Sequence, residues 1–265
     1  MKDTFTTVLG IARGAAAILR EGYGRVEQVE YKGAVNLVTE WDRKSEAFIV
    51  ESLRGAFPEY GIHAEEGGAE DHDSEYEWLI DPLDGTTNFA HAFPIFAVAI
   101  ALMHRGKPIL GVVVDPLREE YFTATAGGGA ALNGRPIHVS PTKSLGVSLL
   151  TTGFPYDVRT HPQNNVAEFA NFCVRAQAVR RAGSAALDLC WTASGRADGF
   201  WEFRLKPWDV AAGALIVLEA GGRVTDAQGG ERYLTGQSIV ASNGLIHDEM
   251  LRVLTEGAEA PLPGN

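Results

Sequence analysis

Cysteine is scarce in this chain, which has only Cys173 and Cys190 among its 265 residues. Two cysteines cannot form the disulfide framework that supports many small secreted proteins. Both lie among apolar neighbours, so we expect small buried side chains and not reactive thiols. The lack of a disulfide framework indicates the reducing cytoplasm as the location of the protein.

Long hydrophobic runs are missing too. The uncharged stretch of residues 88–103 contains His91 and Pro94 and falls short of the ~20 apolar residues that span a bilayer. In the first 20 residues, Arg13 and Arg20 interrupt the apolar stretch, which indicates an amphipathic helix and not a secretory signal. We therefore expect no membrane partner.

Basic residues are outnumbered, since 23 Lys and Arg stand against 34 Asp and Glu and leave a net charge of −11. This balance argues against a broad nucleic-acid-binding face. It also means that something other than net charge must attract an anionic substrate. With 45% apolar and 22% charged residues, the chain is neither disordered nor collagenous nor a coiled coil.

Hydrophobic periodicity predicts an α-then-β first half. Apolar residues at helical spacing indicate helices over about 4–21 and about 42–55. Short apolar segments then indicate a series of strands, at 78–80, 96–102, 109–114, 121–125 and 136–139. The dipeptide Asn133-Gly134 is typical of a type I′ turn between two strands.

The second half alternates between strands and helices. We expect strands at 147–151 and 199–203, and helices at 165–176, 184–194 and 209–219, with two closing elements at 238–241 and 245–254. A soft boundary falls near 140–147, but no flexible linker separates the halves. Ligands favour the cleft between two such halves.

The most informative segment is Asp81-Pro82-Leu83-Asp84-Gly85-Thr86-Thr87-Asn88-Phe89. An apolar strand delivers Asp81, and Pro82 is expected to form a turn that returns Asp84 beside it. Two carboxylates on a rigid turn suit Mg²⁺, which prefers oxygen ligands and keeps several waters. Backbone N–H groups at the start of the following segment could hold a phosphate. Taken alone, the segment fits a type I turn capped by its own Asp side chains equally well.

Two more acidic motifs accompany this segment. Glu65 and Glu66 lie beside Gly67, where a solvated loop is the simpler interpretation. Asp209 follows Trp208 and opens a predicted helix, where Asp is a common N-cap for local reasons. Each motif by itself favours the local structural interpretation.

Taken together, these motifs resemble the inositol monophosphatase family of magnesium-dependent, lithium-sensitive phosphatases. The resemblance covers roughly residues 14–249, and the chain looks most like the bacterial members of the family. Besides residues 81–89 it includes Glu65-Glu66, Asn36-Leu37-Val38-Thr39-Glu40-Trp41-Asp42, Gly183-Ser184-Ala185-Ala186 and Trp208-Asp209-Val210-Ala211-Ala212-Gly213.

The resemblance implies both a fold and a reaction. The fold would be α+β, a layered αβαβα sandwich of the sugar-phosphatase type. Its active site would lie between residues 1–145, with the main metal-binding motifs, and residues 146–265, with Asp209 and substrate contacts. The two halves would form one compact unit and the protein a homodimer. The reaction would be Mg²⁺-dependent hydrolysis of a phosphomonoester, myo-inositol 1-phosphate, by a metal-activated water.

Carried over residue by residue, the resemblance also implies a cluster of two or three Mg²⁺ ions. Glu65, Asp81 and the Leu83 carbonyl would hold the first ion, and Asp81, Asp84 and Asp209 the second. Such ions can activate a water and neutralise phosphoryl oxygens. The acidic residues would then bind metal, and the metal would attract the anionic substrate.

The remaining implied residues orient the water and the substrate. Thr86, with Asp42 as its partner, would help orient the attacking water, and Glu65 would belong to the catalytic set. Lys32 resembles a loop lysine near the metals. The implied substrate contacts are Asp84, Gly85, Thr86, Gly183, Ser184, Ala185, Glu202 and Asp209.

Other functions make different demands on the sequence. An aspartyl-phosphate phosphatase uses a second Asp two residues after the nucleophile, whereas Asp81 and Asp84 are three apart. A non-catalytic binding protein on the same fold would be expected to lose metal ligands, and none of the implied ligands is missing. Arg180-Arg181 or Arg204 could bind a second phosphate, which retains fructose 1,6-bisphosphate as an alternative substrate. 3′-Phosphoadenosine 5′-phosphate and histidinol phosphate are further alternatives.

Overall fold

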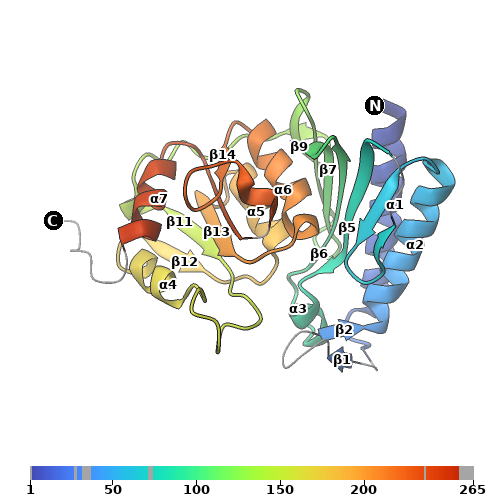
Figure 1. Cartoon of the computed structure of the whole chain (residues 1–265), viewed down its shortest axis with the longest axis horizontal. Coiled ribbons are helices and arrows are strands. Elements are labelled where there is room, and N and C mark those ends of the chain that lie inside the picture. Colours follow the sequence, from blue (N-terminus) through green and yellow to red (C-terminus); the bar gives the residue numbers. More distant parts are fainter. Residues whose placement is uncertain (1, 27–28, 32–36, 71–73, 236, 257–265) are drawn as a thin grey trace.

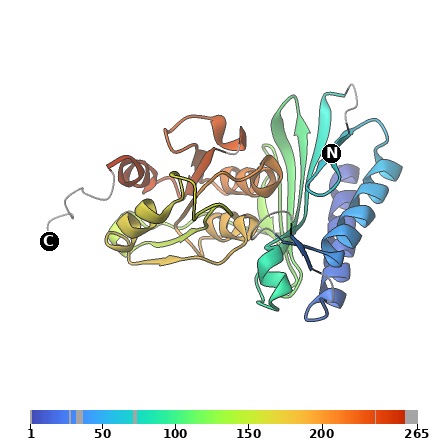
Figure 2. The ribbon, with the colours of Figure 1, turned by 60° about the horizontal axis from the view of Figure 1, so that its bottom comes forward.

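The computed structural model describes residues 2–26, 29–31, 37–70, 74–235 and 237–256. Helices and sheets alternate in five layers, which Figure 2 shows nearly edge-on. The order is α1 and α2, an eight-stranded sheet, α5 and α6, a five-stranded sheet, and finally α4 and α7 (Figure 1). The predicted αβαβα sandwich is confirmed.

The first layer consists of α1 (Lys2–Gly22) and α2 (Glu40–Ala56). One stripe of α1, including Val8, Ala15 and Leu19, is buried because apolar residues recur at helical spacing. Thr39 caps α2, since its side chain accepts a hydrogen bond from the Trp41 N–H. Both helices were predicted, and they cover the outer face of the eight-stranded sheet.

The eight-stranded sheet has the strand order β10-β9-β8-β7-β6-β5-β3-β4. All neighbouring strands are antiparallel except β3 and β5. Its strands are β3 (Gly61–Ala64), β4 (Gly68–Glu70), β5 (Tyr76–Asp84), β6 (Ala97–His104), β7 (Lys107–Asp115), β8 (Glu120–Thr125), β9 (Gly129–Leu132) and β10 (Arg135–Pro136). Alternate residues face opposite layers, so Trp78 and Ile80 pack toward the outer helices and Leu79 toward the middle ones.

Two local predictions in this sheet need correction. The chain does not turn at Pro82: β5 continues to Asp84, with a register shift against β6 between Asp81 and Asp84. Such an irregularity re-aims the side chains at the end of a strand. The strand predicted at 136–139 is limited to the short β10. The turn before it is as predicted, since Asn133 and Gly134 both have positive φ.

The five-stranded sheet has the order β12-β11-β13-β15-β14. Its strands are β11 (Leu149–Thr152), β12 (Ala178–Arg180), β13 (Gly199–Phe203), β14 (Arg223–Thr225) and β15 (Ser238–Ser242). The outer helices are α4 (Val166–Cys173) and α7 (His247–Glu256). Cys190 is buried as expected, but Cys173 is exposed because it ends α4 at the surface.

The middle helices α5 (Ala185–Ala193) and α6 (Pro207–Glu219) join the two sheets. One hydrophobic core contains residues of both helices and of both sheets. The backbones approach closely, since a Cβ on Gly111 of β7 would lie 2.8 Å from the Ala212 carbonyl oxygen. This packing holds the start of α6 against the eight-stranded sheet.

Small elements complete the chain: β1 (Val29–Tyr31) pairs with β2 (Leu37–Thr39), α3 (Thr86–Ala90) follows β5, and two 3₁₀ turns lie at Leu145–Val147 and Arg232–Thr235. None of the helices within the described residues has the length and apolar character to cross a membrane.

Candidate active site

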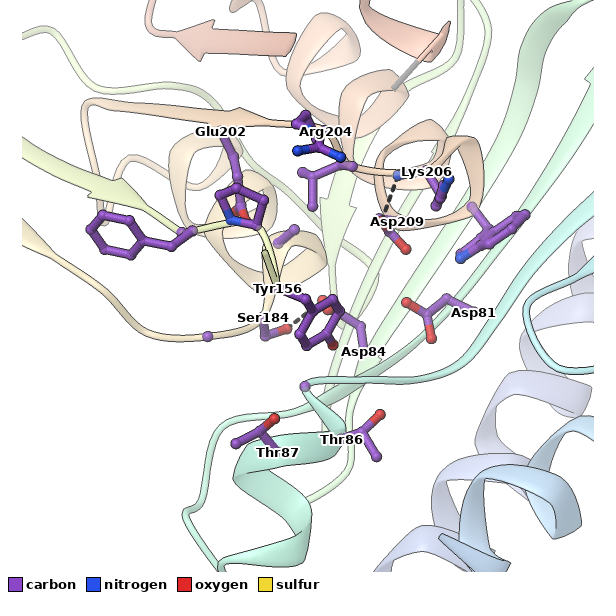
Figure 3. Close-up of a pocket in the computed structure, with 18 of the residues that line it drawn as sticks. Asp81, Asp84, Thr86, Thr87, Tyr156, Ser184, Glu202, Arg204, Lys206 and Asp209 are labelled. Carbon is purple, nitrogen blue, oxygen red and sulfur yellow. Dashed lines mark hydrogen bonds between the residues drawn. The ribbon is translucent and has the colours of Figure 1, made fainter. Parts of the chain in front are cut away.

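A cleft of about 300 Å³ lies where the ends of both sheets meet the middle helices. It is formed by the end of β5, the start of α3, the loop after β11, the segment before α5, the end of β13 and the start of α6. Figure 3 shows Asp81 and Asp84, from the end of β5, and Asp209, from the start of α6, pointing into the same space. Glu65, in the turn after β3, also lines the cleft.

Backbone and hydroxyl donors hold two of these carboxylates. Asp84 Oδ2 accepts hydrogen bonds from the Ser184 hydroxyl at 2.6 Å and from the Ala186 N–H at 2.7 Å. Asp81 is 2% exposed and accepts a hydrogen bond from the Leu83 N–H at 3.0 Å. The end of β5 is therefore tied to the N-terminal turn of α5.

Asp209 is held by its own helix. The N-cap of α6 is Lys206, and Asp209 is the third residue of the helix and not the N-cap that its sequence position suggested. Its carboxylate accepts a hydrogen bond from the Lys206 N–H at 2.7 Å. Pro207 starts the helix, where no N–H is needed.

The carboxylates repel one another. Burial raises the pKa of Asp81 and of Asp209 well above the ordinary value, and the charges of Glu65 and Asp84 raise both further. Burial also raises the pKa of Asp84 to about 6, although the hydrogen bonds from Ser184 and Ala186 oppose the shift. A divalent cation between these groups would offset the repulsion.

The donor set fits a hard cation, because the acidic side chains of the cleft offer oxygen ligands and Leu83 also lines the cleft. In the described ranges, however, no three His, Cys, Asp or Glu side chains stand close enough to hold one metal ion as they are. A bound ion would therefore draw carboxylates closer together than they stand here.

A buried threonine and aspartate adjoin the carboxylates. The Thr86 hydroxyl lies 2.9 Å from Asp42 Oδ1 and 3.1 Å from the Leu83 carbonyl oxygen. Asp42 is fully buried in the first turn of α2, and its other oxygen accepts hydrogen bonds from the Thr39 N–H and hydroxyl. Burial raises the pKa of Asp42 to about 6. The sequence resemblance had paired these two residues, and the structure brings them into contact.

Two glycines bring the start of α3 and the start of α5 together. Gly85 has φ of +98°, and a Cβ there would lie 3.1 Å from the carbonyl oxygens of Gly183 and Ile95. The Asn88 amide donates to the Ile95 and Ala182 carbonyls at 2.8 and 2.9 Å. The implied substrate contacts Gly85, Gly183, Ser184 and Ala185 therefore line one wall of the cleft.

The opposite wall carries Glu202, which is 8% exposed. Burial and the charge of Asp84 raise its pKa to about 8, while Arg181 opposes the shift. Arg181 lines the cleft, whereas Arg180 is absent from its lining. Arg204 lines it as well but donates to Asp157 at 2.6 Å.

Sequence reasoning missed several lining residues, namely Gly153, Phe154, Pro155, Tyr156, Lys206 and Trp208. Phe154, Pro155 and Tyr156 sit in a loop after β11 whose Gly and Pro would signal only a turn. Burial raises the pKa of Tyr156, and the charges of Glu65, Asp84 and other carboxylates raise it further. Figure 3 shows its ring beside Asp84.

Glu66, by contrast, lies outside the cleft. Its N–H donates to Glu46 Oε2 at 2.8 Å, and it lines a separate groove with Arg43 and Arg54. His63, His91 and His104 are also absent from the lining of the cleft, although the His63 ring contacts Trp208. Lys32 lies outside the described residues.

The chain is similar to known proteins along nearly its whole length. Residues 1–259 match the family model described as the inositol monophosphatase family. An inositol-1-monophosphatase of Synechocystis is 48% identical over 88% of this chain and 82% of its own. The Nus factor SuhB of Vibrio cholerae is 48% identical over 92% of each chain. A solved inositol monophosphatase structure from Anabaena has 44% identity and a TM-score of 0.88, covering 97% of this chain and 96% of its own.

The raised pKa of Asp84 predicts a pH dependence for the metal-free protein. The folded state binds this proton near pH 6 and the unfolded state near ~3.9. Stability should therefore decrease as pH rises from about 4 through about 6. In EDTA at pH 7 we expect Asp84→Asn to raise the melting temperature by several degrees, and by less at pH 4.5, in scanning calorimetry.

The control for that measurement is Asp248→Asn on α7, whose side chain is 84% exposed. It removes the same charge from the surface and should not raise the melting temperature. An Asp84→Asn protein that melts below wild type at pH 7 without metal would contradict the predicted cost of burying the Asp84 charge.

Proposed function

Since the chain belongs to the inositol monophosphatase family and is a phosphatase, we propose that it hydrolyses myo-inositol 1-phosphate to inositol and phosphate with Mg²⁺. The observation that carries the proposal is the meeting of four carboxylates with the Thr86–Asp42 pair in one cleft. A phosphate monoester resists uncatalysed hydrolysis, so such a site must stabilise much negative charge.

In this proposal the carboxylates hold two or three Mg²⁺ ions. Glu65, Asp81 and the Leu83 carbonyl serve the first ion, and Asp81, Asp84 and Asp209 serve the second. When bound, the ions lower the pKa of a water and neutralise the phosphoryl oxygens. The raised pKa values of Asp81, Asp84 and Asp209 support this assignment. Burial disfavours the charged form of all three side chains, and neighbouring carboxylates add to this at Asp81 and Asp209, so bound cations would offset both effects.

Thr86 orients the attacking water in this scheme. Its hydroxyl donates to Asp42, whose carboxylate also accepts two hydrogen bonds from Thr39. Because the Thr86 hydroxyl donates its proton to Asp42, its oxygen can accept a hydrogen bond from the attacking water. This hydrogen bond helps to remove a proton from the water as its oxygen attacks the phosphorus. Glu65, which also lines the cleft, completes the catalytic set.

The substrate is held between the two walls of the cleft. The backbone N–H groups of Gly85 and Thr86 receive the phosphate at the start of α3. Ser184 and Ala185 contact the polyol from the start of α5. Glu202 accepts hydrogen bonds from polyol hydroxyls, and its place in the lining supports this role.

A sugar bisphosphate is the second candidate substrate, because Arg181 lines the cleft and faces both Glu202 and Asp84. A guanidinium there could bind the second phosphate of fructose 1,6-bisphosphate. The test compares kcat/KM for that ester, myo-inositol 1-phosphate, 3′-phosphoadenosine 5′-phosphate and histidinol phosphate. A higher kcat/KM for 3′-phosphoadenosine 5′-phosphate or for histidinol phosphate would contradict both candidate substrates.

Loss of one proposed ligand should abolish turnover and leave the fold intact. Asp84→Asn keeps the shape of the side chain and removes its charge, so we expect kcat to fall more than ~100-fold. This loss exceeds the ~10–100-fold that is usual for residues that only hydrogen-bond to a metal ligand. EDTA should have the same effect on wild type. The matched control is Glu66→Gln, which should stay within about tenfold of wild type because Glu66 lies outside the cleft. Full activity in excess EDTA would refute the metal requirement.

Lithium should inhibit the reaction at millimolar concentration. It would occupy the second ion's site after turnover, so inhibition should be uncompetitive toward substrate. Steady-state rates over a grid of lithium and substrate concentrations measure this pattern. Competitive inhibition, or none, would contradict the proposed role of Asp209 and Asp84 at that site.

We also propose that the protein is a homodimer, as the family resemblance implies. Light scattering at micromolar concentration should give twice the 28.5 kDa mass of one chain. A mass of one chain under these conditions would refute the proposal.

A further inference from the structure

The backbone of Gly153 lies directly against the carboxylate of Glu202. A Cβ on Gly153 would stand 2.3 Å from both carboxylate oxygens. Gly153 is not among the residues with positive φ, so its backbone conformation is open to any residue. Glycine is needed here because the Glu202 carboxylate occupies the space that a side chain would take.

Gly153 is held in this place by a buried amide. Asn165, fully buried, donates to the Gly153 carbonyl oxygen at 2.6 Å and to the Thr152 hydroxyl at 2.9 Å. Its own side-chain oxygen accepts a hydrogen bond from Trp201 Nε1 at 2.7 Å. Trp201 is the neighbour of Glu202 on β13, so the amide joins Gly153 to the strand that carries the carboxylate.

Other contacts prevent the loop from moving away. Thr152 pairs with Trp201 across the parallel strands β11 and β13, and its hydroxyl donates to the Trp201 carbonyl at 2.6 Å. Past Gly153, Asp157 accepts a hydrogen bond from Arg204 at 2.6 Å, just beyond the end of β13. The loop is thus tied to β13 before and after Gly153, and a new methyl group there could be relieved only by moving Glu202.

We propose that Gly153 is a specificity-determining residue. Because it has no side chain, the Glu202 carboxylate has room to lie where it faces the polyol of the substrate. Asn165 is the positioning residue that keeps Gly153 there. The esters favoured by this arrangement carry hydroxyl groups beside the phosphate. The inference rests on the proposed function, in which Glu202 accepts hydrogen bonds from those hydroxyls.

The test is Gly153→Ala, assayed on two phosphate esters with Mg²⁺. Myo-inositol 1-phosphate has hydroxyls for Glu202, and p-nitrophenyl phosphate has none. We expect kcat/KM for the inositol ester to fall about tenfold or more, as the loss of one or two hydrogen bonds to Glu202 implies. For p-nitrophenyl phosphate it should stay within about threefold, because the metal ligands and Thr86 are untouched.

A double-mutant cycle isolates the route of the effect. In a Glu202→Ala background, Gly153→Ala should cause no further loss on the inositol ester, since the group that it displaces is gone. The matched control is Gly10→Ala in α1, where a Cβ would meet nothing within 4 Å. That variant should keep both activities.

A crystal structure of Gly153→Ala separates this inference from the proposed substrate. If wild type hydrolyses p-nitrophenyl phosphate but not the inositol ester, the substrate proposal fails. A displaced Glu202 side chain in the Gly153→Ala structure would then still show that Gly153 sets the position of Glu202. An unmoved Glu202, equal losses on both esters, or additive losses in the cycle would overturn the inference.

Discussion

The mutual repulsion of buried carboxylates at the end of β5 is the constraint on which the rest of this site depends. Asp81, Asp84 and Asp209 are forced into one cleft, and each is held by hydrogen bonds from a different source. These donors are backbone N–H groups and the Ser184 hydroxyl, and not Lys or Arg side chains. They therefore hold each carboxylate in place and leave most of its charge available to a cation.

The layered fold supplies the rigid parts that this arrangement needs. Asp84 and Asp81 end a strand that is paired on both sides, while Asp209 and the partners of Asp84 come from helices packed between two sheets. The close approach of Gly111 to Ala212 fixes α6 against the eight-stranded sheet. A cleft built on such elements keeps its shape although its charges repel.

The carboxylate cluster also explains how an acidic protein can bind an anionic substrate. The chain carries a net charge of −11, yet its phosphatase activity requires an anionic substrate. Cations bound by the carboxylates would reverse the local charge, and Arg181 adds a permanent positive group at the rim. The wall that carries Glu202 differs in kind, since Glu202 is buried, its pKa is raised to about 8, and a Cβ on Gly153 would lie 2.3 Å from its side-chain oxygens.

The sequence by itself determined most helices and strands, because hydrophobic periodicity is a local property. The layered fold class and the acidic residues of the cleft followed from the family resemblance that its short motifs carry. It could not show that β5 runs on through Pro82 or that Glu66 lies outside the cleft, since strand register and the direction of a loop depend on distant partners. The contact between Thr86 and Asp42 could be anticipated only by resemblance. Gly153, Tyr156 and Asn165 carried no signal at all. Their roles arise only when β11, β13 and α4 pack together, because tertiary packing alone decides which backbone meets which carboxylate.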